Sequence, residues 1–182
     1  VHKPSGWVTY ADSREQEKFS AKAQLEKQLK RKLFPVHRID KDTCGILAFA
    51  FHPAMARNLT ALFRTRTVKK QYVAVVHGAV PERGVIDEPL ERNKEKVKEP
   101  ALTEYHRLGV AEVDWGEPRV YSLVRLSPQT GRYHQLRRHL RFLGHPIVGD
   151  PEYGNAWDNR AFEEKFRVRR TLLSAVNLSF PD

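Results

Sequence analysis

Two polar stretches of the sequence carry side chains that could do chemistry, and the first surrounds Asp40. Arg38, Asp40 and Lys41 stand directly before an apolar run, residues 45–51, that predicts a buried strand. A carboxylate held at the edge of a core with cations around it is kept ionised and aimed. On pattern alone a polar loop is the simpler explanation, because Asp, Thr and Gly also supply turn chemistry. Both interpretations of Asp40 stay open at this point.

The second stretch is basic and covers residues 130–154. A short segment of it holds Arg132, His134, Gln135, Arg137, Arg138, His139 and Arg141. A helix cannot hide so many cations, so we expect them at the surface. For a lone helix a solvated face is the simplest explanation, but Tyr133 among the cations and a net charge of +10 favour contact with RNA or DNA.

Several common catalytic and metal-binding patterns do not fit these residues. The segment HRID differs from the kinase catalytic loop, which has Asp directly after Arg, and no Gly-rich phosphate loop precedes it. His134 and His139 are five positions apart, a poor shared face for a metal ion on a helix. No Ser lies in a nucleophile elbow. A nucleophilic or acid–base carboxylate remains, and we expect no metal.

Helices and strands that could position these residues follow one another without regular alternation. A capping box, Ser13 with Gln16, predicts a helix start. The helices that we expect are 13–33, 52–64 and one from Thr130 to Gly144. The strands that we expect are 45–51, 68–80, 101–110, 119–128 and 171–180, with an exposed, charge-rich excursion over 81–100. The pattern favours an α+β fold, a mixed, mainly antiparallel β-sheet flanked by helices, over a doubly wound one.

Composition bounds the number of domains and the class of partner. With 182 residues and 40% hydrophobic content the chain can bury one substantial core, so we expect a single domain over residues 1–182. Lys and Arg number 32 against 22 Asp and Glu. This excess predicts a polyanionic partner, either nucleic acid or an anionic membrane surface.

The ends and the single cysteine suggest a compartment. No apolar run approaches the roughly 20 residues that span a bilayer, and the N-terminus lacks a signal pattern, so we expect a soluble protein. Cys44 alone cannot form an intrachain disulfide, which fits the reducing cytoplasm. The chain starts at Val1 without Met, so we expect a few residues to precede it, and the presence of an RNA-binding domain upstream stays open.

Three ordered motifs resemble those of the RluA-type pseudouridine synthases. HRIDKDTCG is similar to the first signature of that family, KKQYVAVVHG to its second, and TGRYHQLRRHLRFLGHPIVGDPEYG to its third. KPSGW near the start and LLSAVNLSF near the end also resemble family landmarks, so the similarity covers nearly the whole chain. It implies a pseudouridine synthase fold and an RNA isomerase that needs no cofactor and acts as a monomer.

The resemblance also implies a role for each matched residue. Asp40 would be the catalytic carboxylate, and Arg38 would help to extrude the target nucleotide and fill the vacated stack. Tyr72 would lie against the uracil ring and act in proton transfer, while Arg137 would pair with Asp40. Further RNA or base contacts would come from Leu136, Lys70, Arg132, His134, Arg138 and Arg141.

Two other functions stay open beside this one. The continuation RRHL and the segment KPSGW look most like the subgroup that acts on transfer RNA, so transfer RNA is favoured over ribosomal RNA. A non-catalytic RNA-binding protein on the same scaffold has no reason to retain Asp40, Tyr72 and Arg137 together. A DNA-binding regulator lacks support, because no recognition-helix pattern or dimerising coiled coil is present.

Overall fold

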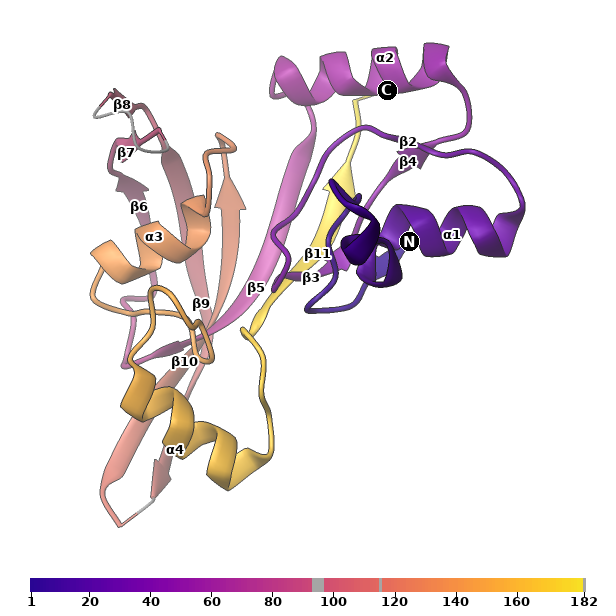
Figure 1. Cartoon of the computed structure of the whole chain (residues 1–182). Coiled ribbons are helices and arrows are strands. Elements are labelled where there is room, and N and C mark those ends of the chain that lie inside the picture. Colours follow the sequence, from indigo (N-terminus) through magenta and orange to yellow (C-terminus); the bar gives the residue numbers. More distant parts are fainter. Residues whose placement is uncertain (93–96, 115, 182) are drawn as a thin grey trace. The chain divides into compact units, whose positions relative to one another are not determined.

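The computed structural model describes residues 1–92, 97–114 and 116–181 and forms two compact units (Figure 1). Unit 1 comprises Val1–Lys69 and Ser174–Asp182, and unit 2 comprises Lys70–Leu173. Both ends of the chain belong to unit 1, so unit 2 is inserted into its sequence. The expectation of one catalytic domain over residues 1–182 stays a prediction.

Unit 1 contains a small mixed sheet in the order β1, β3, β11. Strand β1 (His2–Lys3) pairs antiparallel with β3 (Cys44–Ile46), and β11 (Leu173–Ser179) pairs parallel with β3. Gly45 permits this last pairing, because its φ is +113° and a Cβ there would clash with the carbonyl oxygen of Ala175. The glycine that begins the apolar run is therefore required by a neighbouring strand.

The apolar run 45–51 is not the single strand that its composition predicts. It forms β3 and a second short strand, β4 (Phe49–Ala50), which pairs antiparallel with β2 (Phe34–Pro35) in a separate sheet. Between them the N–H of Leu47 donates to the carbonyl of Val1, and the N–H of Ala48 donates to the ring of His37. Because Leu47 and Ala48 donate to Val1 and His37, the chain leaves the sheet of β3 here and enters the sheet of β4.

The helix expected over 13–33 is two helices, a 3₁₀ helix η1 (Arg14–Phe19) and α1 (Ala21–Leu29). They are separated because Val8 bridges to Ser20 and holds it extended. Ser13 makes no side-chain cap, whereas Ser20 caps α1 by accepting from the N–H of Ala23. The expected capping box is therefore wrong.

The helix expected over 52–64 is confirmed as α2 (Pro53–Arg64). Proline stands in its first turn, where its missing N–H costs nothing, and His52 precedes it in an extended conformation. Strong local start signals of this kind need no tertiary information.

Unit 2 is built on an antiparallel sheet in the order β5, β10, β9, β6. The strands are β5 (Lys69–His77), β10 (Pro118–Pro128), β9 (Leu102–Asp114) and β6 (Arg83–Asp87). A separate hairpin pairs β7 (Leu90–Glu91) with β8 (Lys98–Glu99). The expected excursion over 81–100 thus contains paired strands, although residues 93–96 lie outside the described part. Trp115, between the expected strands 101–110 and 119–128, also lies outside it.

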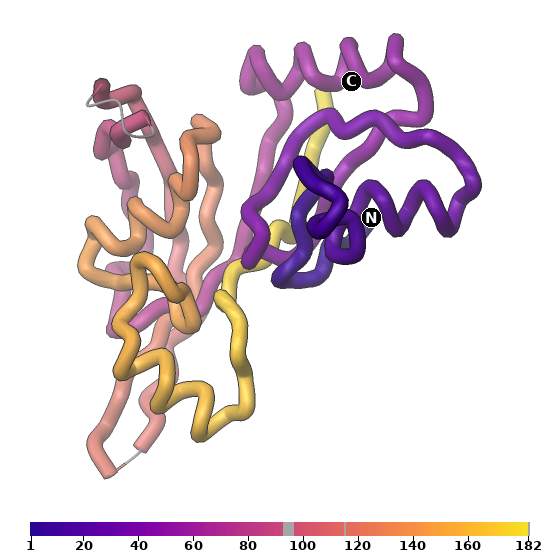
Figure 2. The backbone as a smooth tube through the Cα atoms, in the orientation of Figure 1, coloured from indigo at the N-terminus to yellow at the C-terminus, as the bar shows by residue number. Residues whose placement is uncertain are grey.

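Two helices complete unit 2, and Figure 2 shows the path of the chain through them. Helix α3 (Gln135–Phe142) packs Leu136 and Leu140 into a core formed with sheet residues such as Val76, Val124 and Leu126. It starts later than the expected Thr130, because His134 adopts a left-handed conformation with φ 49°. Helix α4 (Ala156–Phe166) was not expected, and its Phe162 ring lies 5.5 Å from that of Tyr121 on β10.

The expected fold class is confirmed, since the chain is mixed α+β with a mainly antiparallel sheet and flanking helices. Over the described ranges, no helix is both long and apolar enough to cross a membrane.

Candidate active site

Asp40 lies in unit 1 on the turn between β2 and β3. The N–H of Thr43 donates to the Asp40 carbonyl at 3.2 Å, which closes the turn. The preceding residue, Ile39, is buried, and the Thr9 hydroxyl both donates to its carbonyl at 3.3 Å and accepts from its N–H at 3.4 Å. Asp40 itself is half-buried. Its backbone is therefore fixed on both sides while its side chain keeps access to solvent.

A buried lysine joins the same turn to the N-terminal segment. The Lys3 ammonium is fully buried and donates to the carbonyls of Pro4 at 3.0 Å, Trp7 at 2.6 Å and Lys41 at 2.9 Å. One side chain thus holds together two segments that lie far apart in the sequence. The sequence contained Lys3 only as part of the KPSGW landmark, and no local pattern indicated its three carbonyl partners.

Removing the Lys3 ammonium should destabilise the protein. Burial lowers the pKa of Lys3 to about 8, although the nearby acidic groups of Cys44, Asp42 and Asp40 raise it. Lys3→Met keeps the length of the side chain but leaves three carbonyls without their donor. We expect the free energy of unfolding to fall by about 2–4 kcal/mol, measured by urea denaturation.

The exposed Lys27→Met on α1 is the matched control and should change this free energy by less than about 0.5 kcal/mol. Folded Lys3 loses its proton at a lower pH than unfolded Lys3. The free energy of unfolding of the parent, relative to that of Lys3→Met, should therefore increase as the pH rises from about 8 towards 10.5. Equal free energies of unfolding for Lys3→Met and Lys27→Met would show that the three hydrogen bonds of Lys3 do not stabilise the protein.

Arg38 is exposed, and its neighbour His37 is anchored. The His37 ring accepts from the N–H of Ala48 at 3.0 Å and stacks on Phe63 with ring centroids 4.4 Å apart. The Arg38 guanidinium lies 5.7 Å from the centre of the Tyr10 ring. Because His37 is held in place, the backbone of the exposed Arg38 is also positioned, and its guanidinium is accessible to a partner.

Tyr72 and Lys70 lie in unit 2 near the start of β5. Tyr72 is paired with Leu126 across the ladder and packs, partly buried, against the unit 2 core. Lys70 donates to the carbonyl of Thr130 at 3.2 Å. Residues of the second and third motifs are therefore brought together within unit 2.

Gln135, which the sequence suggested only as one polar member of the basic stretch, organises the third motif. It is buried and uses both ends of its amide. Its oxygen accepts from the Thr130 hydroxyl at 2.7 Å and from the N–H of Arg132 at 3.0 Å. Its nitrogen donates to the Leu102 carbonyl and the Thr103 hydroxyl, each at 3.0 Å. These four bonds fix the loop that leads into α3.

Arg137 is buried and forms a two-pronged ion pair with Asp150. Its Nε and one terminal nitrogen lie 2.7 and 2.8 Å from the two carboxylate oxygens. Its other terminal nitrogen lies 3.0 Å from Nδ1 of His134, and its guanidinium lies 4.9 Å from the Tyr153 ring centre. The guanidinium is therefore held in one orientation.

Asp150 is the functional candidate that the sequence did not reveal. Burial raises its pKa, but hydrogen bonds from Arg137 and from the N–H groups of Glu152 and Tyr153 outweigh burial and lower the pKa overall. Asp40 and Arg137 belong to different units, so their expected pairing stays a prediction. Asp150 belongs to the third motif, so its place in that motif is the signal that could have identified it as a partner for Arg137.

The other arginines of the basic stretch differ in their surroundings. Arg132 forms an ion pair with Glu99 at 2.6 Å, and Arg138 donates to the carbonyl of Glu91 at 3.0 Å. Arg141 is exposed. Two of the three expected phosphate-binding arginines are thus tied to the β7–β8 hairpin.

The expectation that a helix cannot hide these cations is wrong for two residues. Arg137 and His139 are buried, the latter because its ring meets the Thr103 hydroxyl at 2.9 Å and the Glu88 carbonyl at 3.0 Å. Burial lowers the pKa of His139 and favours its neutral form. Leu136 is also buried in the unit 2 core, where its expected contact with a base stays a prediction.

Acidic, histidine and cysteine side chains are the usual protein ligands of metal ions. In the part of the chain that the structure describes, no group of three or more of these residues could hold a metal ion.

Comparison with known proteins places this arrangement in a family. Residues 1–142 match the family model described as RNA pseudouridylate synthase. The chain is 38% identical over 194 residues to tRNA pseudouridine synthase C of Haemophilus ducreyi, covering 99% of this chain and 80% of that protein. It is 36% identical over 193 residues to the enzyme of the same name from Salmonella typhimurium, covering 98% and 74%.

A solved structure agrees with these sequence matches. Human RNA Pseudouridylate Synthase Domain Containing 1 superimposes with a TM-score of 0.77 at 29% identity, covering 98% of this chain and 73% of that one. The sequence and fold matches both extend over nearly the whole chain. The chain therefore belongs to the RNA pseudouridylate synthase family, whose members isomerise uridine to pseudouridine in RNA.

Proposed function

We propose that this chain forms pseudouridine in transfer RNA, with Asp40 as the catalytic carboxylate. The observation that carries the proposal is the fixed turn around Asp40, where Lys3 and Thr9 hold the backbone from the N-terminal segment. A catalytic group positioned before the substrate arrives needs no reorganisation during the reaction.

The proposed reaction rearranges one nucleotide without oxidation or reduction. The bond between C1′ of the ribose and N1 of uracil breaks, the base turns, and a new bond joins C1′ to C5. The C5 proton leaves and N1 gains a proton, so all atoms are retained. Ionised Asp40 can act as a nucleophile or stabilise positive charge at the sugar.

Arg137 is proposed to keep Asp40 ionised by pairing with it. A guanidinium has five N–H donors, more than one carboxylate can accept, so it can serve Asp150 and a second carboxylate together. An arginine beside a carboxylate favours the charged form. The rigid pair of Arg137 with Asp150 would then set the direction from which Arg137 meets Asp40.

The target base must leave its stack before any of this chemistry, at a cost of a few kcal/mol. We propose that exposed Arg38 occupies the vacated position. Tyr72 is proposed to lie against the uracil ring and transfer a proton, and Leu136 to cover an apolar face of the base. Lys70, held on the Thr130 carbonyl, would border the same site.

The RNA backbone is proposed to contact the basic residues of the third motif. Arg141 is exposed, whereas Arg132 and Arg138 must exchange partners on the β7–β8 hairpin for phosphate oxygens. His134 would contribute from the turn before α3. We further propose that the enzyme acts as a monomer in the cytoplasm, where a chain with a single cysteine stays reduced.

Transfer RNA is proposed because the curated relatives named above carry it in their names. Cells that lack this protein should lose pseudouridine at one or very few sites in transfer RNA, since one local RNA fold can be recognised around the flipped base. Site-resolved pseudouridine mapping of transfer and ribosomal RNA measures this. Complementation with the parent chain should restore the site, and complementation with Asp40→Asn should not.

The outcomes separate the alternatives. Loss confined to ribosomal RNA would overturn the choice of transfer RNA and keep the reaction. Unchanged modification in all RNA, together with no pseudouridine formed by the purified protein, would instead favour an RNA-binding protein on the same scaffold.

A further inference from the structure

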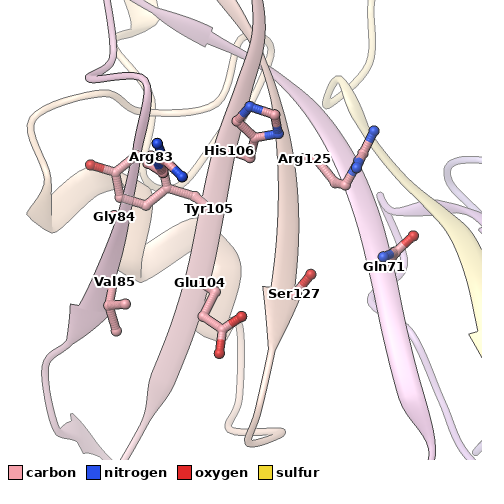
Figure 3. A pocket seen from close by; sticks show the side chains of 9 residues that line it. All are labelled: Gln71, Arg83, Gly84, Val85, Glu104, Tyr105, His106, Arg125 and Ser127. Carbon is pink, nitrogen blue, oxygen red and sulfur yellow. The ribbon is translucent and has the colours of Figure 1, made fainter.

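A cavity of about 450 Å³ lies on the sheet face of unit 2 that is turned away from the core (Figure 3). Its polar lining comes from four neighbouring strands and includes Arg83, Glu104, His106, Arg125, Ser127 and Gln71. Strand residues alternate between the two faces of a sheet. Intervening residues such as Tyr105 and Leu126 are accordingly buried in the core.

Two arginines and a histidine form a row across this face. Arg83 on β6 is paired directly with His106 on β9, and His106 is paired with Arg125 on β10. Neighbouring strands lie about 4.8 Å apart, so the backbones that carry the two arginines are about 10 Å apart. All three side chains are exposed. We call Arg83, His106 and Arg125 the cationic row.

The arginines of the row differ from most other arginines of unit 2 in their charge environment. Arg132, Arg137 and Arg119 are paired with the carboxylates of Glu99, Asp150 and Asp158. Within residues 1–92, 97–114 and 116–181, neither Arg83 nor Arg125 forms an ion pair. Their positive charge is therefore available to a ligand.

We infer that the cationic row binds the phosphate backbone of RNA at a place distinct from the candidate active site. Guanidinium groups match phosphate oxygens in a two-pronged geometry. Gln71 lines this cavity, whereas its chain neighbour Tyr72 packs against the core on the opposite face. The RNA segment bound by the row therefore differs from the segment that presents the target uridine. This inference rests on the proposed function.

A second row beside the first suits RNA better than a simple anion. Val85, Glu104 and Ser127 are paired across the same three strands, and the Glu104 carboxylate accepts from the Gln129 amide at 3.2 Å. A carboxylate would repel an isolated phosphate ion. It can instead accept a hydrogen bond from a ribose 2′-hydroxyl, with the Ser127 hydroxyl as a further partner.

A competing explanation is that the arginines only protect an edge. In the order of the strands β6 is the last, and charged side chains on edge strands hinder unwanted pairing with other chains. Such a role needs no RNA and predicts no change in RNA affinity when the charges are removed. It also does not account for Arg125, which lies on β10 between β5 and β9.

The test compares two double variants that lose the same formal charge. Arg83→Gln with Arg125→Gln removes the row, and Arg160→Gln with Arg169→Gln removes arginines on exposed ion pairs with Glu164 and Glu163. Binding of fluorescently labelled, unfractionated transfer RNA is measured from about 50 to about 200 mM salt. Each lost phosphate contact should reduce the slope of log affinity against log salt by about 0.7–0.9.

The affinity of both proteins should fall as salt rises over this range. Because two contacts are missing, the factor by which it falls should be about ten times smaller for the row variant than for the parent. The control variant should keep the parent slope, and Arg83→Lys with Arg125→Lys should keep most of it. Equal slopes for the row variant and the parent, or equal slope changes in both glutamine variants, would overturn the inference. Circular dichroism confirms that each variant is folded.

Pseudouridine formation by the same preparations separates this inference from the proposed function. Saturating RNA should restore the parent rate to the row variant, because the row does not touch the reacting base. A parent that forms no pseudouridine in transfer RNA but shows the predicted difference in slope would contradict the proposed function alone. An active parent with unchanged slopes would contradict the row alone.

Discussion

Asp40→Asn should fold and bind RNA like the parent but form no detectable pseudouridine. The substitution nearly preserves shape, and the hydrogen bond from Thr43 goes to the main-chain carbonyl of residue 40, which the substitution retains. It removes the charge and the nucleophilicity that the proposed reaction needs. We expect the single-turnover rate to fall by a factor of about 10⁴ or more, measured as pseudouridine formed in transfer RNA.

The matched control is Asp42→Asn, two positions along the same turn. It makes the same change of charge, and the hydrogen bond from the Ser5 hydroxyl also goes to a main-chain carbonyl that remains. Its rate should stay within about threefold of the parent, since uniform charge effects are small beside the loss of a reacting group. If Asp40→Asn retained a rate close to that of Asp42→Asn, the assignment of the catalytic carboxylate would be wrong.

Asp150→Asn should strongly destabilise the protein although it removes almost no volume. It leaves the buried Arg137 guanidinium without its anionic partner, so we expect the free energy of unfolding to fall by about 3–5 kcal/mol. Urea denaturation at neutral pH measures the change. Glu164→Gln, which breaks the exposed pair with Arg160, should cost less than about 1 kcal/mol.

The effect of Asp150 should also depend on pH. Because its folded pKa lies below the ordinary value of 3.8, its ionised form contributes stability that is present above that value and lost as the pH falls through the folded pKa. The difference between parent and Asp150→Asn should therefore disappear in acid. A difference that stays constant down to acidic pH would assign the loss to packing instead of charge.

Sequence predicted best the elements whose signals are local. Helix α2 was bounded by Pro53, and the strands expected over 101–110 and 119–128 correspond to β9 and β10, although β9 continues to Asp114. The family motifs also predicted the fold class. These features depend on residues within one or two turns of each other, which a pattern can contain.

Sequence failed where a distant partner decides the structure. Ser20 ends one helix and starts the next because it forms a β-bridge with Val8. The run 45–51 forms two short strands because the N–H groups of Leu47 and Ala48 between them donate to Val1 and His37. Helix α4 has no buried residue and gave only a weak periodic signal.

The same limit applies to the candidate site. Asp40 was found from its motif, but Lys3, which donates to the Lys41 carbonyl in the same turn, lies 38 positions away. Asp150 lies 13 positions after Arg137, too far for the periodicity of one helix to reveal the pair. Burial of Arg137 and His139 could not be anticipated, because exposure is the usual state of such residues in a basic helix.

Because unit 2 is inserted into the sequence of unit 1, the two units cannot fold in the same order as they are synthesised. Strand β3, which follows the Asp40 turn, pairs with β11 near the other end of the chain, and all of unit 2 is synthesised between them. Unit 2 is contiguous and can fold as it leaves the ribosome, whereas β3 must wait for its neighbour. A chain that ends before Ser174 therefore lacks the strand that pairs with β3 beside the Asp40 turn, and we expect such a chain to form no pseudouridine.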